Sequence, residues 1–297
     1  MATIYTEQGK NIWRTWVLFA GFFALIVALG YSASYYYGNP NILYIAVIFS
    51  LVMNFASYWW SDKVVLTLAG AKPLAHEESP EIYHLVENLA ITAGLPLPKI
   101  YLIDDSAPNA FATGRDKNHA VVAVTRGLVE RLDKNELEGV IAHELSHIGN
   151  RDILLQTVVV TLVGFVAILS DMFTRSLIWG GRRDDREGGG GWLMIVGIVL
   201  MVLSPIIATL IQLAISRRRE FLADASGALL TRYPEGLASA LKKISAYGQP
   251  LTHASTATAH LYISNPFGSA GMKGMAKLFM THPPVEERIK ALDNMAL

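Results

Sequence analysis

The sequence predicts a mainly α-helical membrane protein with a small β-sheet, and three observations carry this prediction. Only 17% of the 297 residues are charged and 52% are hydrophobic, whereas soluble domains carry about 25% charged residues. Two polar segments, 61–152 and 216–297, are long enough to build a domain between them. Four apolar stretches approach or reach the roughly 20 residues that a membrane-spanning helix needs: 13–31, 42–60, 153–170 and 192–215.

Composition excludes several classes of protein. The net charge is zero and no basic patch stands out, so the sequence does not predict nucleic-acid binding. Cysteine is absent, which excludes disulfides, thiolate catalysis and cysteine-based zinc sites. Any metal ion must therefore be held by His, Asp or Glu. The lack of disulfides also fits a reducing compartment.

We expect four regions along the chain. Residues 1–60 form two transmembrane helices, 61–152 begin a polar domain, 153–215 form a transmembrane hairpin, and 216–297 complete the domain. The hairpin contains a loop rich in Gly, Arg and Asp at 180–191, to which the sequence assigns no role. The stretch 153–170 is the shortest of the four, so whether it spans fully stays open.

Basic residues near the first two spans predict their orientation. Lys10 and Arg14 precede the first span, Lys63 and Lys72 follow the second, and the connector 38–41 has no basic residue. Because cytoplasmic loops carry the excess of Lys and Arg, the polar domain should be cytoplasmic. The first stretch also exceeds the apolar core of a cleaved signal peptide, which is about 7–15 residues long.

The polar segments contain start signals for helices and two short apolar strands. Ser79 followed by Pro80 is a good helix start. Asp133, with Glu136 three residues later, resembles a capping box. We expect helices over 80–94, 134–148, 234–247 and 283–295, and buried strands over 99–103 and 120–124.

The segment His143-Glu144-Leu145-Ser146-His147 contains an H-E-x-x-H pattern inside a predicted helix. Spacing of four residues stacks both imidazoles on one helical face, where they can bind one Zn²⁺. Glu144 would take a proton from a metal-bound water. The pattern also occurs by chance in unrelated helices. However, apolar residues precede it here, and burying these polar groups unpaired would be costly, a problem that a metal resolves.

A catalytic zinc site has three protein ligands and a water, so a third ligand is needed. Glu220 is the best candidate, because it follows the fourth apolar stretch while His147 precedes the third. Two crossings return the chain to the membrane face it left. Asp224, one helical turn after Glu220, could accept the free N–H of His143. The alternative is that Glu220 and Asp224 lie on a solvated face beside Arg217, Arg218 and Arg219.

Four blocks of sequence now resemble a known family: 109–114 (N-A-F-A-T-G), 143–152 (H-E-L-S-H-I-x-N-R-D), 217–224 (R-R-x-E-F-x-A-D) and 281–289 (T-H-P-P-x-x-E-R-I). In this order around apolar spans, they are similar to the HtpX family of membrane-bound zinc peptidases, which are related to the CAAX prenyl proteases. The resemblance implies a zincin-like (gluzincin) catalytic domain. It also implies one zinc ion held by His143, His147 and Glu220, with Glu144 as general base.

The resemblance implies further roles that the residues alone do not establish. His282 and Arg288 would face the site and stabilise the oxyanion, although the spacing itself suggests only a loop that caps a helix. Asn109, Phe111 and Ala112 would lie on an edge strand that pairs with an extended substrate. The remaining histidines show no ligand spacing and should be bystanders: His76, His84, His119, His253 and His260.

The sequence thus predicts a multi-pass zinc endopeptidase of a bacterial-type inner or plasma membrane, with a cytoplasmic site. Its partners would be the lipid bilayer and polypeptide substrates, chiefly membrane proteins. The resemblance implies a role in stress response, through quality control of misfolded membrane proteins. Two alternatives are a prenyl-protein processing protease of the CAAX type and a transporter with a structural zinc. The spans carry few ionisable residues, which argues against the transporter.

Overall fold

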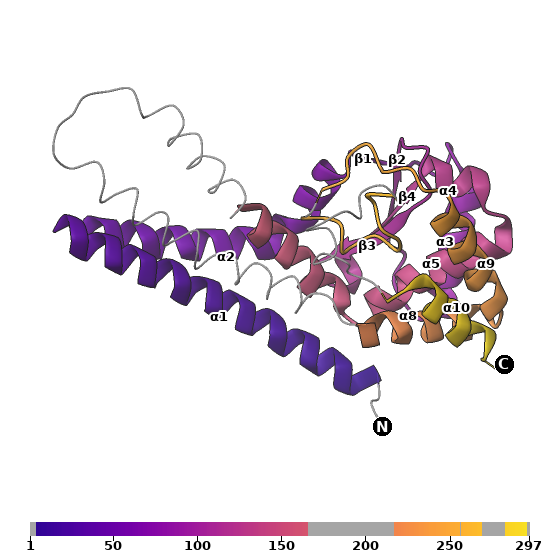
Figure 1. Ribbon diagram of the computed structural model, residues 1–297, viewed down its shortest axis with the longest axis horizontal. Coiled ribbons are helices and arrows are strands. Elements are labelled where there is room, and N and C mark those ends of the chain that lie inside the picture. The colour runs from indigo at the N-terminus through magenta and orange to yellow at the C-terminus, as the bar shows by residue number, and fades with distance from the viewer. Residues whose placement is uncertain (1–3, 166–216, 256, 269–282, 296–297) are drawn as a thin grey trace.

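Two long helices project from a domain that combines a small sheet with shorter helices (Figure 1). The computed structural model describes residues 4–165, 217–255, 257–268 and 283–295. The Gly-rich loop 180–191, the fourth apolar stretch 192–215 and His282 lie outside the described residues. The expectations for these three parts of the chain therefore stay predictions.

The two projecting helices are α1 (Ile4–Tyr37) and α2 (Asn41–Leu68), joined by a turn at Gly38 with φ of 62°. Gly9–Tyr37 and Asn41–Leu68 are each long and apolar enough to cross a membrane. Large apolar side chains such as Ile48 and Leu51 remain exposed on α2. Lipid would cover this surface, so both N-terminal membrane helices agree with the prediction. The helix α2 continues past the expected end at residue 60.

The sheet has four strands in the order β1-β2-β4-β3. The strands β2 and β4 are parallel, whereas β1–β2 and β3–β4 are antiparallel pairs. Every residue of β4 is buried, as expected for an inner strand, and β3 lies at the edge of the sheet. The strand bounds are β1 Ala71–Pro73, β2 Lys99–Ile103, β3 Ala110–Gly114 and β4 Ala120–Thr125.

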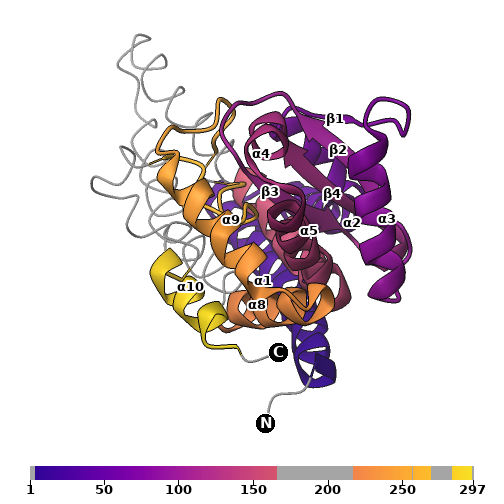
Figure 2. The same cartoon turned by 90° about the vertical axis from the view of Figure 1, so that its right-hand side faces the viewer.

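The helix α5 (Lys134–Gly149) begins at a capping box, as predicted. Asp133 accepts a hydrogen bond from the Glu136 backbone N–H, and the Glu136 side chain accepts from the Asp133 N–H. Figure 2 shows α5 between α3 and α9 in the interior of the domain. The other helices of the domain are α3 Pro80–Thr92, α4 Arg126–Arg131, α8 Arg217–Thr231, α9 Pro234–Ala246 and α10 Val285–Asp293.

Two glycines let the neighbouring helices approach α5 closely. A Cβ on Gly227 of α8 would lie 2.9 Å from the backbone nitrogen of His143. A Cβ on Gly139 of α5 would lie 2.7 Å from the backbone nitrogen of Leu237 in α9. A Cβ atom essentially never lies this close to another heavy atom, so any larger residue would push these helices apart. The spacing between α5 and α8 therefore depends on Gly227.

The third apolar stretch begins as the helix Asp152–Phe165, which is bent by 85° relative to α5. Arg151 forms the bend with φ of 58°. The side chains of Val158 and Leu162 are buried and pack with Phe22 of α1. The described part of this stretch is thus covered by protein. Two membrane-length helices are present in the described residues, and the four-span count stays a prediction.

Candidate metal centre

The structure brings His143, His147 and Glu220 together inside the domain. The two Nε2 atoms on α5 lie 3.2 Å apart. Glu220, from α8, places Oε1 3.7 Å from Nε2 of His147 and Oε2 3.9 Å from Nε2 of His143. All three side chains are buried, and their ligand atoms lie within 4.8 Å of one another. The sequence had predicted this set of three.

The residues present fit a metal ion. Two imidazole nitrogens and a carboxylate oxygen at these distances all offer lone pairs to one point, and two His with one Glu is a known ligand set of catalytic zinc. Glu144 supplies a second observation. Its buried Oε2 has no hydrogen-bond partner among the described residues. Leaving such an atom unpaired is costly, and a metal-bound water could satisfy it.

Each of the two imidazoles is oriented by its own carboxylate. Nδ1 of His143 donates to Oδ1 of Asp224 over 2.9 Å, and Nδ1 of His147 donates to Oδ2 of Asp152 over 3.0 Å. These bonds leave the Nε2 lone pairs free to face the centre. The contact of Asp224 with His143 was predicted. The contact of Asp152 was missed, although Asp152 belongs to the H-E-L-S-H-I-x-N-R-D block.

The two histidines differ in charge preference. Burial lowers the pKa of His143 to about 4, so its imidazole is neutral near pH 7. Burial also disfavours the charged form of His147. However, the hydrogen bond to Asp152 and the charge of Glu220 act in the opposite direction and raise the pKa of His147 to about 9. Since a metal binds only neutral imidazole, protons compete with the metal at His147.

Arg288 faces this site from α10, but its guanidinium is bound to Asp224. Nε and Nη2 donate to the two carboxylate oxygens over 2.8 and 2.6 Å, and Nη1 donates to the Ile263 carbonyl over 3.0 Å. Burial would raise the pKa of Asp224, yet Arg288 and His143 together lower it to about 2. In this arrangement Arg288 keeps Asp224 ionised and in place. Its predicted partner in oxyanion stabilisation, His282, lies outside the described residues.

A second buried network reaches the site from the first membrane helix. Nδ2 of Asn11 in α1 donates to Oδ1 of Asp152 and to the carbonyl of Asn150. Nη1 of Arg219 donates to Oδ1 of Asn11 over 3.2 Å, and Nε of Arg219 lies 3.8 Å from Oδ1 of Asp152. Asn11, Asp152 and Arg219 are each at most 2% exposed. Sequence reasoning missed this network, because nothing marks an Asn in the polar segment before the first apolar stretch as a partner of residue 152.

Glu144 lies beside the edge strand β3. Burial raises the pKa of its carboxyl to about 7, against the effect of the nearby His147. The backbone N–H of Ala112 donates a hydrogen bond to this carboxylate. A base whose pKa lies near neutrality can both take and return a proton at physiological pH.

The predicted substrate residues are Phe111 and Ala112 in β3 and Asn109 just before it, and all three have buried side chains. Phe111 is buried and packs edge-on against Tyr262, with ring centroids 5.2 Å apart. The Asn109 side chain donates to the Ser264 carbonyl over 3.0 Å. The outer edge of the strand is partly used as well, because the Ile263 N–H donates to the Ala110 carbonyl. Pairing with a substrate backbone would use the remaining part of the edge.

The histidines expected to be bystanders join no metal-binding group within the ranges that the structure describes. His260 is the buried one, and its Nε2 lies 3.2 Å from the Gln156 carbonyl. This contact ties the loop after α9 to the helix Asp152–Phe165.

An H-E-x-x-H helix of this kind, joined to membrane-length helices, places the chain among the membrane-bound metalloproteases. Residues 76–296 match the model described as peptidase family M48, and the chain belongs to that family. Two curated relatives, both called "Protease HtpX homolog", come from Thermoanaerobacter pseudethanolicus and Pyrococcus abyssi. They are 46% and 47% identical, over 99% and 98% of each chain respectively. The resemblance noted in the sequence is thereby confirmed.

A solved structure shows the same fold at much lower sequence identity. The crystal structure of S. mikatae Ste24p aligns with 97% of this chain and 67% of its own, with a TM-score of 0.51 and 20% identity. This likeness concerns the fold alone.

Proposed function

We propose that this membrane metalloprotease is a zinc-dependent endopeptidase that cleaves polypeptides at the membrane surface. One observation carries the proposal of zinc. His143, His147 and Glu220 converge on one point, and the far nitrogen of each imidazole is bound to a carboxylate. This is the pattern in which partners of the ligands hold a zinc site in its binding geometry.

Each residue of the site would have its own role in peptide hydrolysis. A bound zinc ion supplies Lewis acidity, which polarises a carbonyl and lowers the pKa of water. His143, His147 and Glu220 would hold it. Glu144, with its pKa raised to about 7, would accept the proton of the attacking water and donate it to the leaving amine. His282 would help to bind the oxyanion, and Arg288 would hold Asp224.

The substrate would bind as an extended chain along β3. Since Asn109 and Phe111 have their side chains engaged within the domain, recognition would come from the strand backbone. The Ala112 N–H is held by Glu144, so pairing would begin at the Ala112 carbonyl. Backbone pairing of this kind gives affinity with little sequence preference. It suits a protease that acts on many unfolded polypeptides, in keeping with a role in quality control and stress response.

The proposed topology has four spans, with the catalytic domain, divided into 61–152 and 216–297, in the cytoplasm of a bacterial-type cell. The start of α1 and the end of α2 lie on the domain side in Figure 1, and the flanking Lys10, Arg14 and Lys63 favour the cytoplasm. Processing of prenylated proteins is the weaker candidate. Only the fold likeness to Ste24p favours it, whereas the closely similar full-length relatives are HtpX proteases.

The test of this function is Glu144→Gln in the full-length protein, purified in detergent and incubated with zinc and casein. We expect proteolysis to fall at least about 100-fold, because the base is lost, while bound zinc stays at one ion per chain. Glu138→Gln, the same change on the same helix, is the matched control and should keep full activity. Full activity of Glu144→Gln would disprove the mechanism.

A further inference from the structure

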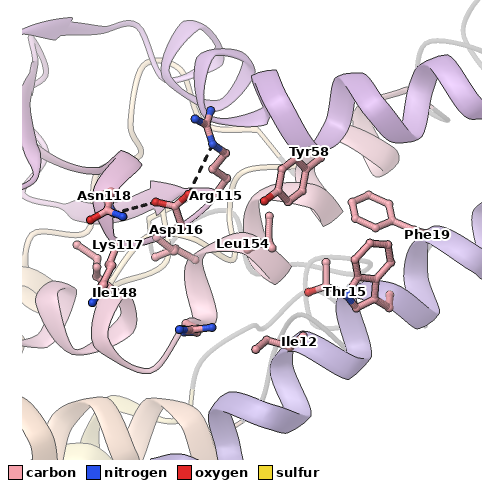
Figure 3. Close-up of a pocket in the computed structure, with 13 residues that line it drawn as sticks. Ile12, Thr15, Phe19, Tyr58, Arg115, Asp116, Lys117, Asn118, Ile148 and Leu154 are labelled. Atoms are coloured by element: carbon pink, nitrogen blue, oxygen red, sulfur yellow. Dashed lines mark hydrogen bonds and ion pairs between the residues drawn. The ribbon is translucent and has the colours of Figure 1, made fainter.

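A pocket of about 420 Å³ lies between the first membrane helix and the catalytic domain, as Figure 3 shows. Neither the three candidate metal ligands nor Glu144 lines it. Its walls come from α1, from α2, from the segment after β3 and from the bend between α5 and the next helix. Its lining includes Trp16, Phe19, Arg115, Lys117, Arg151 and Leu154.

The polar wall of the pocket is cationic. Arg115, Lys117 and Arg151 come from two separate segments, and Asp116 is the one acidic residue among the lining residues described. The Asp116 carboxylate is already engaged: it accepts from the backbone N–H groups of Asn118 and His119. It also binds the His119 ring over 2.8 Å and lies 3.6 Å from Nε of Arg115. The lining residues therefore carry a net positive charge that Asp116 does not neutralise.

The other wall is apolar and lies at the level of the membrane surface. Trp16, Phe19 and Leu154 line it, and the guanidinium of Arg115 lies 4.6 Å from the ring centre of Trp59. Trp16 and Trp59 are both exposed. Exposed Trp near the ends of membrane helices marks the level of the lipid headgroups. Cations and an apolar surface therefore meet at the depth where a headgroup joins its acyl chains.

We propose that this pocket binds an anionic phospholipid, with the phosphate held by Arg115, Lys117 and Arg151 and the upper acyl chain against Trp16, Phe19 and Leu154. Basic pockets between membrane helices on the cytoplasmic side are suited to such headgroups. The volume is also within the range of small-molecule sites, about 300–1,000 Å³. The lipid would join α1 to the domain at a point away from the metal centre.

A polypeptide substrate is the rival occupant, because the pocket begins at Arg115, one residue past the end of β3. The observations favour the lipid. A protease that binds by backbone pairing needs free strand edges, and none of the β3 residues lines the pocket. Three cations would instead restrict substrates to acidic sequences, whereas every anionic phospholipid carries the phosphate that they fit.

The experiment titrates the full-length protein in detergent with phosphatidylglycerol and counts bound lipids by native mass spectrometry. Phosphatidylcholine and inorganic phosphate serve as comparison ligands. We expect wild-type protein to prefer phosphatidylglycerol. The triple variant Arg115→Gln, Lys117→Gln, Arg151→Gln should lose this preference, with affinity falling about fivefold for each cation removed. Lys117→Gln alone should lower the lipid affinity about fivefold. Lys117 is exposed, so this variant should fold normally.

The matched control removes the same charge elsewhere: Lys99→Gln, Lys134→Gln and Arg232→Gln. Arg232 and Arg151 both have a positive φ, 53° and 58° respectively. Each triple variant therefore replaces one arginine at a position of this backbone conformation. An equal loss of lipid in this control would overturn the proposal in favour of general surface charge. Displacement of the bound phosphatidylglycerol by inorganic phosphate alone would overturn the proposal in favour of a site for free anions. If the triple variant in the pocket kept its lipid binding but had a raised KM for a soluble peptide, the pocket would be assigned to the substrate. Because lipid counting needs no proteolysis, these outcomes are independent of the proposed zinc chemistry.

Discussion

At the scale of single residues, the candidate metal centre depends on carboxylates that would not touch the metal. Asp224 and Asp152 each accept a hydrogen bond from the Nδ1–H of one imidazole and so fix which nitrogen faces the centre. Both are buried, and both are also bound by an arginine or asparagine side chain. The two histidine ligands are therefore positioned by a second set of residues, which come from α1, α8, α10 and the bend after α5: Asn11, Asp224, Arg288 and Asp152.

Asp152→Ala tests this second set at the position that the sequence did not predict. Without its carboxylate, the His147 ring loses the bond that orients it. We expect zinc affinity to fall about 10–100-fold, which is typical for the loss of such a partner. Competition with a zinc chelator would measure this affinity. Asp104→Ala, which removes an exposed carboxylate paired with Arg126, should leave zinc affinity unchanged. Equal affinity in Asp152→Ala would show that His147 needs no orienting partner.

At the scale of the elements, the distance between α5 and α8 determines whether Glu220 reaches the two histidines. Gly227 faces the α5 backbone at Ala142 and His143, where an added Cβ would meet atoms at 3.1 and 2.9 Å. The contact is with backbone, which cannot rotate away as a side chain can. A small residue is therefore required at this crossing.

Gly227→Ala should destabilise the protein although alanine favours helices. Helix propensity alone would add about 1 kcal/mol of stability, but overpacking costs about 1–3 kcal/mol. We expect a lower melting temperature together with weaker zinc binding, because Glu220 moves with α8. Gly164→Ala is the control, since an added Cβ there meets nothing within 4 Å. It should be neutral or stabilising. A stabilised Gly227→Ala variant with normal zinc affinity would contradict the packing argument.

At the scale of the whole molecule, the first membrane helix and the candidate metal centre form one structure. Asn11 of α1 binds the same carboxylate that orients His147, and it also accepts a bond from Arg219, next to Glu220. A movement of α1 relative to the domain would therefore act on both helices that supply metal ligands. The pocket described above lies on the same boundary between α1 and the domain.

Asn11→Ala should weaken zinc binding from a distance. It removes a hydrogen bond from buried Asp152 and one from buried Arg219, each worth about 1.5–3 kcal/mol because the partner is charged. We expect a smaller drop in zinc affinity than for Asp152→Ala, measured by the same chelator competition. Asn54→Ala removes a bond between α2 and the Phe19 carbonyl of α1. It should lower thermal stability but keep zinc affinity. If both variants behaved alike, Asn11 would serve only helix packing.

Short-range rules are enough to predict the local elements and the two histidines of the ligand set. The capping box at Asp133 and Glu136, the strands 99–103 and 120–124 and the two N-terminal membrane helices follow from short-range rules of capping, alternation and length, so they could be predicted. His143 and His147 could be paired because one helix holds both. Glu220 needed a further argument about membrane crossings, and the resemblance to a known family supported it.

The distant residues that orient those ligands follow from the packing of the folded chain. Asp152 reaches His147 because the chain bends by 85° at Arg151, and no sequence pattern specifies that angle. Asn11 meets Asp152 across 141 positions, and Arg288 of α10 binds Asp224 of α8 beside the candidate metal ligands. Such contacts arise from how whole elements pack, which depends on all the side chains at their interfaces. Spacing along one helix is a local property, whereas the second set of residues depends on the position of every element in the fold.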